Sequence, residues 1–190
     1  YRYHPQIEKV VDLLKNEVIG NLISMESFFG FDARGRKKIF GVKLFKKKLN
    51  ENHRFFNKEL GGGAILDIGC YPVSFSIFVA SLISNFDFNK TKVLNKKKEI
   101  GPTGVDMHSL AEISFENNFK SIVRASLIKN LGKMTKITGT KGELILEDTW
   151  SPANLASIKI TGENKEKIDI ECYNNIYAYE IVILSQCILE

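Results

Sequence analysis

The sequence predicts an α+β fold, in which an open, mainly antiparallel β-sheet carries helices on one face. The first observation is a series of short apolar segments after residue 106, separated by turns rich in Gly, Asn and Asp. Strands that follow one another through tight turns pair in antiparallel fashion. The second observation is that helical periodicity is confined to the two ends of the chain and one central stretch.

The composition is that of an ordinary globular domain. The chain has 190 residues, of which 44% are hydrophobic and 26% charged, so a single domain spanning 1–190 is the economical interpretation. The net charge is +5, and lysines cluster at 46–48 and 96–98, in segments that we interpret as surface loops. Arginine is scarce and no aromatic residues alternate with these lysines. Solvated lysines therefore explain the charge better than a nucleic-acid site does.

The first half of the chain is expected to contain a helix, a strand, a loop and a second helix. Residues 5–15 carry apolar side chains three and four apart after Pro5, which predicts an amphipathic helix. Residues 22–31 alternate as a strand does. Residues 33–57 show no clear period, which is typical of a functional loop or a disordered one. A helix then runs from the glycines at 61–63 to about residue 83, with a kink expected near 69–72 because Pro72 lacks an N–H donor.

The second half is expected to be a meander of strands closed by a helix at 177–190. The expected strands are 86–94, 107–115, 120–128, 134–139, 143–147, 157–161 and 167–172. A lysine-rich turn follows the first of them. The sheet face away from the helices still carries the apolar residues Ile122, Ile128 and Ile137, which marks a partner surface. Self-association through this face, giving a homo-oligomer, is the favoured interpretation.

Cysteine and histidine spacing argues against structural cross-links. The three cysteines are too few and too far apart for a disulfide framework or a zinc ribbon, so free thiols in a reducing, cytoplasmic compartment are expected. No second ligand stands at metal spacing from His4 or His108, so no metal site is expected. The longest apolar run, 71–83, is too short to span a bilayer, and no membrane partner is expected.

The glycines at 61–63 and the helix that follows them form the candidate functional element. Glycine permits positive φ and leaves bare backbone that a ligand can approach, and the first-turn N–H groups would point at that ligand. Asp67 and Tyr71 stand four residues apart, so both side chains lie on one helical face. A carboxylate beside a phenol can act as an acid/base pair. The alternatives are a plain loop for the glycines, a cap or ion pair for Asp67 and a half-buried aromatic for Tyr71.

These residues also carry a resemblance. The run GGGAILDIGCYPV at 61–73 resembles the signature of the Gfo/Idh/MocA oxidoreductases, in the branch of dimeric dihydrodiol dehydrogenases and glucose–fructose oxidoreductase. Four further stretches are similar to segments of that family in the same order: YRYHPQ at 1–6, IGNL at 19–22, ITGTKGEL at 137–144 and YE at 179–180. The resemblance therefore covers nearly the whole chain.

The resemblance implies the C-terminal domain of a two-domain, glyceraldehyde-3-phosphate-dehydrogenase-like enzyme that uses NAD or NADP. The Gly-X-Gly-X-X-Gly turn and the Glu-Lys-Pro segment with the family's catalytic lysine are absent from the sequence. Both belong to a dinucleotide-binding domain expected before Tyr1, so the chain alone is expected to be inactive and to hold no cofactor.

The resemblance also implies roles for particular residues. Tyr71 would exchange a proton with the reacting carbinol of a sugar, polyol or dihydrodiol, and Asp67 would hold the substrate hydroxyl or orient the lysine. Arg54 and His4 are candidates for substrate contacts, and Gly62 and Gly63 would lie close to the cofactor. The alternative function is a non-enzymatic interaction module that uses the sheet face or the basic surface. That module would bind polyanions with a steep salt dependence.

Overall fold

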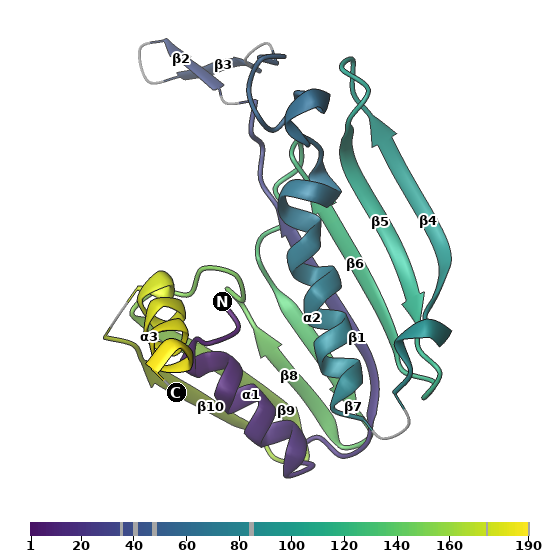
Figure 1. Ribbon diagram of the computed structural model, residues 1–190, viewed down its shortest axis with the longest axis vertical. Coiled ribbons are helices and arrows are strands. Elements are labelled where there is room, and N and C mark those ends of the chain that lie inside the picture. The colour runs from purple at the N-terminus through teal and green to yellow at the C-terminus, as the bar shows by residue number, and fades with distance from the viewer. Residues whose placement is uncertain (35, 40–41, 47–48, 84–85, 174, 190) are drawn as a thin grey trace.

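The computed structural model describes residues 1–34, 36–39, 42–46, 49–83, 86–173 and 175–189. The elements follow the order α1 (Pro5–Lys15), β1 (Leu22–Gly30), β2 (Arg36–Ile39), β3 (Val42–Lys46), α2 (Cys70–Ser81), β4 (Lys92–Ile100), β5 (Asp106–Ser114), β6 (Lys120–Ser126), β7 (Thr135–Gly139), β8 (Gly142–Leu146), β9 (Leu155–Gly162), β10 (Glu166–Glu171) and α3 (Ile176–Leu189). The expected α+β class is confirmed (Figure 1).

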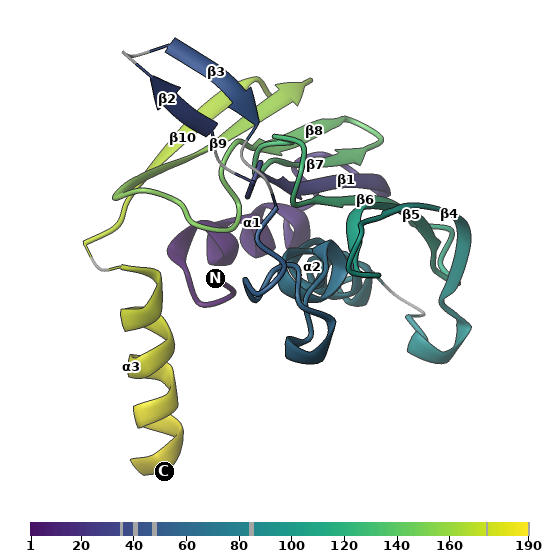
Figure 2. The ribbon, with the colours of Figure 1, turned by 90° about the horizontal axis from the view of Figure 1, so that it is seen from above.

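The architecture is one 8-stranded sheet in the order β10-β9-β8-β7-β1-β6-β5-β4. All neighbouring pairs are antiparallel except β1 and β6, which run parallel. The first strand of the chain therefore lies in the middle of the sheet, between strands that come about a hundred residues later (Figure 1). The helices α1 and α2 lie side by side on one face of this sheet (Figure 2).

The helix α1 spans the residues that the sequence predicted. Its N-cap is His4, whose Nδ1 accepts a hydrogen bond of 3.2 Å from the backbone N–H of Gln6. Pro5 occupies the first turn, where a missing N–H costs nothing. The apolar stripe that begins with Ile7 and Val10 is buried against the sheet.

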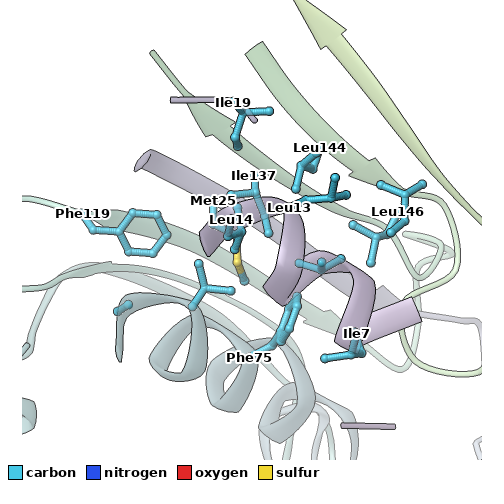
Figure 3. Packing of buried hydrophobic residues seen from close by; sticks show 14 of the residues in the cluster. Ile7, Leu13, Leu14, Ile19, Met25, Phe75, Phe119, Ile137, Leu144 and Leu146 are labelled. Atoms are coloured by element: carbon cyan, nitrogen blue, oxygen red, sulfur yellow. The ribbon is translucent and has the colours of Figure 1, made fainter. Parts of the chain in front are cut away.

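The main core lies between the two helices and the sheet. Met25 of β1, Ile137 of β7 and Leu144 of β8 contribute the sheet side, and Phe75 of α2 the helix side (Figure 3). These side chains are almost completely buried. A second, smaller cluster lies under the residues that precede α2 and includes Phe56, Ala64, Ile68, Met107 and Leu127.

Ile137 was expected on the open sheet face, and this expectation is wrong. In the antiparallel pairing of β7 with β1, Ile137 lies opposite Met25, so it points toward the helices. Ile128 follows the end of β6 and packs against the second cluster. Ile122, whose neighbours Ser121 and Val123 point to the core, remains on the open face.

The segment 86–100 also differs from the prediction. The expected strand at 86–94 starts only at Lys92, and it continues through the lysines expected to form a turn, as far as Ile100. All nine residues of β4 are exposed, because β4 is the edge of the sheet. The polar run adopts strand geometry because it pairs along its length with β5. Lysine on such an edge strand discourages pairing with another chain.

The segment 33–57 was expected to be irregular throughout. Its described residues include a two-stranded antiparallel hairpin, β2 and β3, which belongs to neither edge of the large sheet (Figure 1). The prediction was wrong here because two strands of four and five residues are too short to show a period. Residues 50–57 form turns that lead back to the glycines.

The closing helix α3 projects away from the sheet on the side of α1 and α2 (Figure 2). None of its described residues is buried, although most are apolar. The ring of Tyr179 meets the ring of His4 edge to face at 5.5 Å. This contact attaches the start of α3 to the rest of the domain.

By length and composition, the helical stretch Lys58–Ser81 could cross a membrane, and half of it is buried in the domain. A core helix that covers a sheet has the same composition.

Candidate active site

The candidate site lies where the chain enters α2. Residues Ile65–Gly69 form a π-helical turn, and α2 continues from Cys70. The π-helical turn ends at Gly69, where the segment with the expected kink (69–72) begins, and α2 is regular from Cys70 to Ser81. Pro72 is the third residue of α2 and comes directly after the helical residues of the π-turn, so its missing N–H lies inside a continuous helical stretch. A π-helical turn inside a helix is often found at functional sites.

Two of the three glycines before this turn, Gly62 and Gly63, are explained by close packing of the protein on itself. A β-carbon at Gly62 would lie 2.6 Å from the carbonyl oxygen of Arg54 and 2.7 Å from that of Asn57. A β-carbon at Gly63, where φ is +125°, would lie 2.4 Å from Oδ1 of Asp106. Gly61 has φ +70° and open space around it. Packing within the protein is therefore sufficient to require glycine at 62 and 63, and no ligand is needed to explain these two residues.

Asp67 is the middle residue of the π-helical turn. Its Oδ1 accepts a charge-assisted hydrogen bond from Nη1 of Arg54. The Asp67 side chain is 11% exposed and the Arg54 side chain 64% exposed. The Arg54 guanidinium also lies over the ring of Phe55, 4.4 Å from its centre. The structure therefore joins two of the residues that the sequence singled out into one ion pair.

Tyr71 is half-buried in a group of aromatic side chains that includes Tyr1, Phe29 and Trp150. Their ring centres lie 5.5 to 6.0 Å from that of Tyr71. Burial raises the pKa of Tyr71 above its ordinary value of 10, and the charge of nearby Asp67 acts in the same direction. Tyr71 is therefore a neutral phenol near neutral pH, within electrostatic range of Asp67.

The remaining candidates lie elsewhere. His4 is only 2% exposed, and its Nδ1 is engaged in capping α1, so the structure gives it a structural role. Burial lowers the pKa of His4 below 6.5. Among the described residues, no group of three His, Cys, Asp or Glu side chains could hold a metal ion.

Hollows in the surface open at other places. One of about 800 Å³ lies over β9 and β10 and is lined by Lys159, Lys165 and Lys167 among others. A second of about 740 Å³ is lined by residues such as Asp87 and Glu116. The candidate site instead borders the exposed side chains of Leu60 and Leu66, so it is a surface that another domain could cover.

Sequence reasoning missed Asp106 at this site. Its Oδ2 accepts a hydrogen bond of 3.0 Å from the backbone N–H of Ile65 and one of 2.7 Å from the hydroxyl of Ser109. In sequence, Asp106 stands 41 residues after Ile65 at the start of a strand, and no local pattern marks it. Only the packing of β5 against the π-helical turn brings its carboxylate to the start of the helix.

Sequence comparison connects the chain to a family of oxidoreductase domains. The family model described as GFO/IDH/MocA C-terminal domain matches residues 7–145. Trans-1,2-dihydrobenzene-1,2-diol dehydrogenase of Xenopus tropicalis is 31% identical over 170 residues, which are 89% of this chain and 44% of that protein. The human protein of the same name is 26% identical over 166 residues, 87% of this chain and 42% of the relative. The chain thus spans slightly less than half of these relatives.

Solved structures share the fold. KijD10, a 3-ketoreductase from Actinomadura kijaniata in complex with NADP and TDP-benzene, superposes with a TM-score of 0.76 at 20% identity, over 98% of this chain and 52% of that one. The aldose-aldose oxidoreductase from Caulobacter crescentus gives 0.73 at 16% identity, over 99% and 51% of the two chains. Because the family model matches most of the sequence, this chain belongs to the GFO/IDH/MocA C-terminal domain family.

Proposed function

We propose that this chain is the substrate-binding and dimerisation domain of an NAD(P)-dependent oxidoreductase that acts on the carbinol carbon of a sugar, polyol or dihydrodiol. The observation that carries the proposal is the placement of two candidate groups in one helical stretch: Asp67 lies in the π-helical turn, where it pairs with Arg54, and Tyr71 follows at the start of α2. The relatives named dehydrogenases and reductases are about twice the length of this chain. A dinucleotide-binding domain is therefore the expected source of the cofactor site.

A nicotinamide bound by that domain would exchange hydride with the substrate carbon. This chain would contribute the group that transfers a proton to or from the substrate and the residues that align the substrate. The neutral phenol of Tyr71 can donate a proton to a carbonyl oxygen when the substrate is reduced. When the substrate is oxidised, Tyr71 must lose its proton, and its raised pKa opposes this. A cation next to the phenol is therefore required, and we assign it to the lysine expected in the dinucleotide-binding domain.

Asp67 is suited to hold that lysine or a substrate hydroxyl. Its carboxylate is already paired with Arg54, whose exposed guanidinium keeps further donors free. Arg54 can therefore contact the substrate while it orients Asp67. His4, which is buried as a helix cap, has no comparable access to a ligand among the described residues. Gly62 and Gly63 remain candidates for proximity to the cofactor only as part of the backbone that precedes Asp67.

The test is Tyr71→Phe in an enzyme that contains this chain together with its dinucleotide-binding domain. Loss of the hydroxyl should lower kcat by about a hundredfold or more if the phenol transfers the proton, while substrate KM changes little. Tyr173→Phe is the matched control, because Tyr173 is fully exposed and its hydroxyl contacts only Glu171 in the described chain. A near-normal rate for Tyr71→Phe would refute the acid/base role.

We also propose that the open sheet face pairs with the same face of a second copy. It carries Ile122 and Ile145 among a network of charged side chains, in which Lys136 pairs with Glu26 at 3.2 Å and with Glu143 at 3.5 Å. Arg124 lies over the ring of Phe28, 4.9 Å from its centre. No helix of the described chain covers this face (Figure 2).

A cytoplasmic location fits the free state of all three cysteines.

A further inference from the structure

Asp106 performs a helix-capping function from outside the helix. The helical stretch begins at Ala64 and Ile65, and Ala64 has no side chain that can accept a hydrogen bond. Gly63 before it has none either. The backbone N–H of Ile65 is instead satisfied by Oδ2 of Asp106, at 3.0 Å. A carboxylate at this end also interacts favourably with the positive end of the helix dipole.

The same carboxylate fixes the turn that precedes the helix. Its Oδ1 occupies the space that a β-carbon of Gly63 would need, 2.4 Å away. Ser109, which is buried, donates its hydroxyl to Oδ2 at 2.7 Å and so holds the Asp106 side chain in one orientation. Two strand residues, Asp106 and Ser109, therefore hold the turn against the sheet.

This contact bears directly on Asp67. The backbone N–H of Asp67 donates to the carbonyl of Gly63 at 3.1 Å, so the position of Gly63 sets the position of Asp67. From there, the Asp67 carboxylate reaches Arg54, and Tyr71 follows four residues later in the same helical stretch. A shift of the turn would move Asp67 relative to both.

We propose that Asp106 is a positioning residue for the reaction: it caps the helix that carries Asp67 and Tyr71 and holds Asp67 in its working orientation. This inference rests on the proposed function of those two residues. Asp106 itself contacts neither of them in the hydrogen bonds of the structure, and it acts through Gly63 and Ile65.

The first measurement is hydrogen exchange on the 190-residue chain and its Asp106→Ala and Asp106→Asn variants. Removing the acceptor should speed exchange of the Ile65 and Asp67 amides at least about tenfold in Asp106→Ala. Amides of β1 and β6 should keep their rates. Asp106→Asn retains an acceptor oxygen and should be intermediate. Unchanged protection of the Ile65 amide in Asp106→Ala, or in Asp106→Asn if the alanine variant does not fold, would overturn the capping role.

The second measurement is the kinetics of the same variants in the enzyme with its dinucleotide-binding domain. Asp106→Ala should lower kcat about tenfold or more with cofactor KM nearly unchanged, and Asp106→Asn should recover part of the loss. Asp87→Ala is the matched control, because Asp87 caps a short helical turn away from the site, accepting from Asn89 at 2.9 Å. Its kcat should equal that of the unmodified enzyme.

The outcomes separate this inference from the proposed function. If Tyr71→Phe lowers kcat and Asp106→Ala does not, the positioning role is wrong and the acid/base role stands. If Tyr71→Phe leaves the rate unchanged, the acid/base role fails, and a catalytic positioning role for Asp106 fails with it. If Asp87→Ala lowers kcat as much as Asp106→Ala does, the loss is a general effect of removing a capping carboxylate, and this result would also overturn the inference.

Discussion

At the scale of single residues, His4 gives the domain a pH dependence. Burial of its ring lowers its pKa below the ordinary value of 6.5. Above 6.5 the imidazole is neutral in both the folded and the unfolded chain. As the pH falls through 6.5, the unfolded chain takes up the proton first. The free energy of unfolding should therefore decrease below this pH.

The measurement is the urea-unfolding free energy of the chain and of His4→Asn, at about pH 7.5 and about pH 5. Asparagine keeps an oxygen that can cap α1 but does not titrate. The variant should lose less stability between the two pH values than the unmodified chain does. His108, whose pKa is also lowered by burial, should account for part of the remaining decrease. Equal losses in both chains would contradict the assignment to His4.

Gly63 allows a second residue-scale prediction. Its φ of +125° disfavours any side chain, and a β-carbon would collide with Asp106. Gly63→Ala should lower the free energy of unfolding by about 1–3 kcal/mol. Gly61→Ala is the control, since Gly61 also has positive φ but open space around it, and should cost about 1 kcal/mol. If chemical denaturation shows equal costs for the two variants, the contact with Asp106 has no energetic role.

At the scale of elements, α2 is held by the side chains that it buries against β1 and β6. Phe75 is completely buried and touches the rings of Tyr1 and Trp150. Phe75→Ala should lower the free energy of unfolding by about 3–5 kcal/mol, because it opens a cavity between helix and sheet. Phe88→Ala, at a side chain that is 59% exposed, should change it by less than about 0.5 kcal/mol. Chemical denaturation of both variants makes the comparison, and similar losses would contradict this packing.

The elements also show which sequence signals are dependable. The helix at 5–15 and the strands around 107–114 and 120–126 were predicted from period and turn chemistry, because each buries one face. The strand β4 was misplaced because every one of its residues is exposed. Without a buried face there is no hydrophobic period to detect.

At the scale of the whole molecule, the proposed pairing of the open sheet face with a second copy predicts which substitution changes the oligomeric state. Ile145 lies on this face between Lys136 and Lys159 of the neighbouring strands. Ile145→Glu places a carboxylate between two lysines, which a monomer tolerates. In a dimer that pairs this face, the charge would be buried and should convert dimers to monomers.

Light scattering and sedimentation of the Ile145→Glu variant measure its mass in solution. Ile100→Glu, at the exposed end of edge strand β4, should leave the mass unchanged. An Ile145→Glu variant that keeps the dimer mass would place the interface elsewhere.

The sequence by itself determined the α+β class, most of the elements and the segment 61–73 as the candidate site. These features depend on local pattern, on turn residues and on a motif that is continuous in the chain. Tertiary structure decided that β1 lies in the middle of the sheet, that Gly62 and Gly63 are required by packing, and that Asp106 caps the helix of Asp67. Each of these is a contact between residues far apart in sequence, set by strand register, and no local pattern encodes register across such distances.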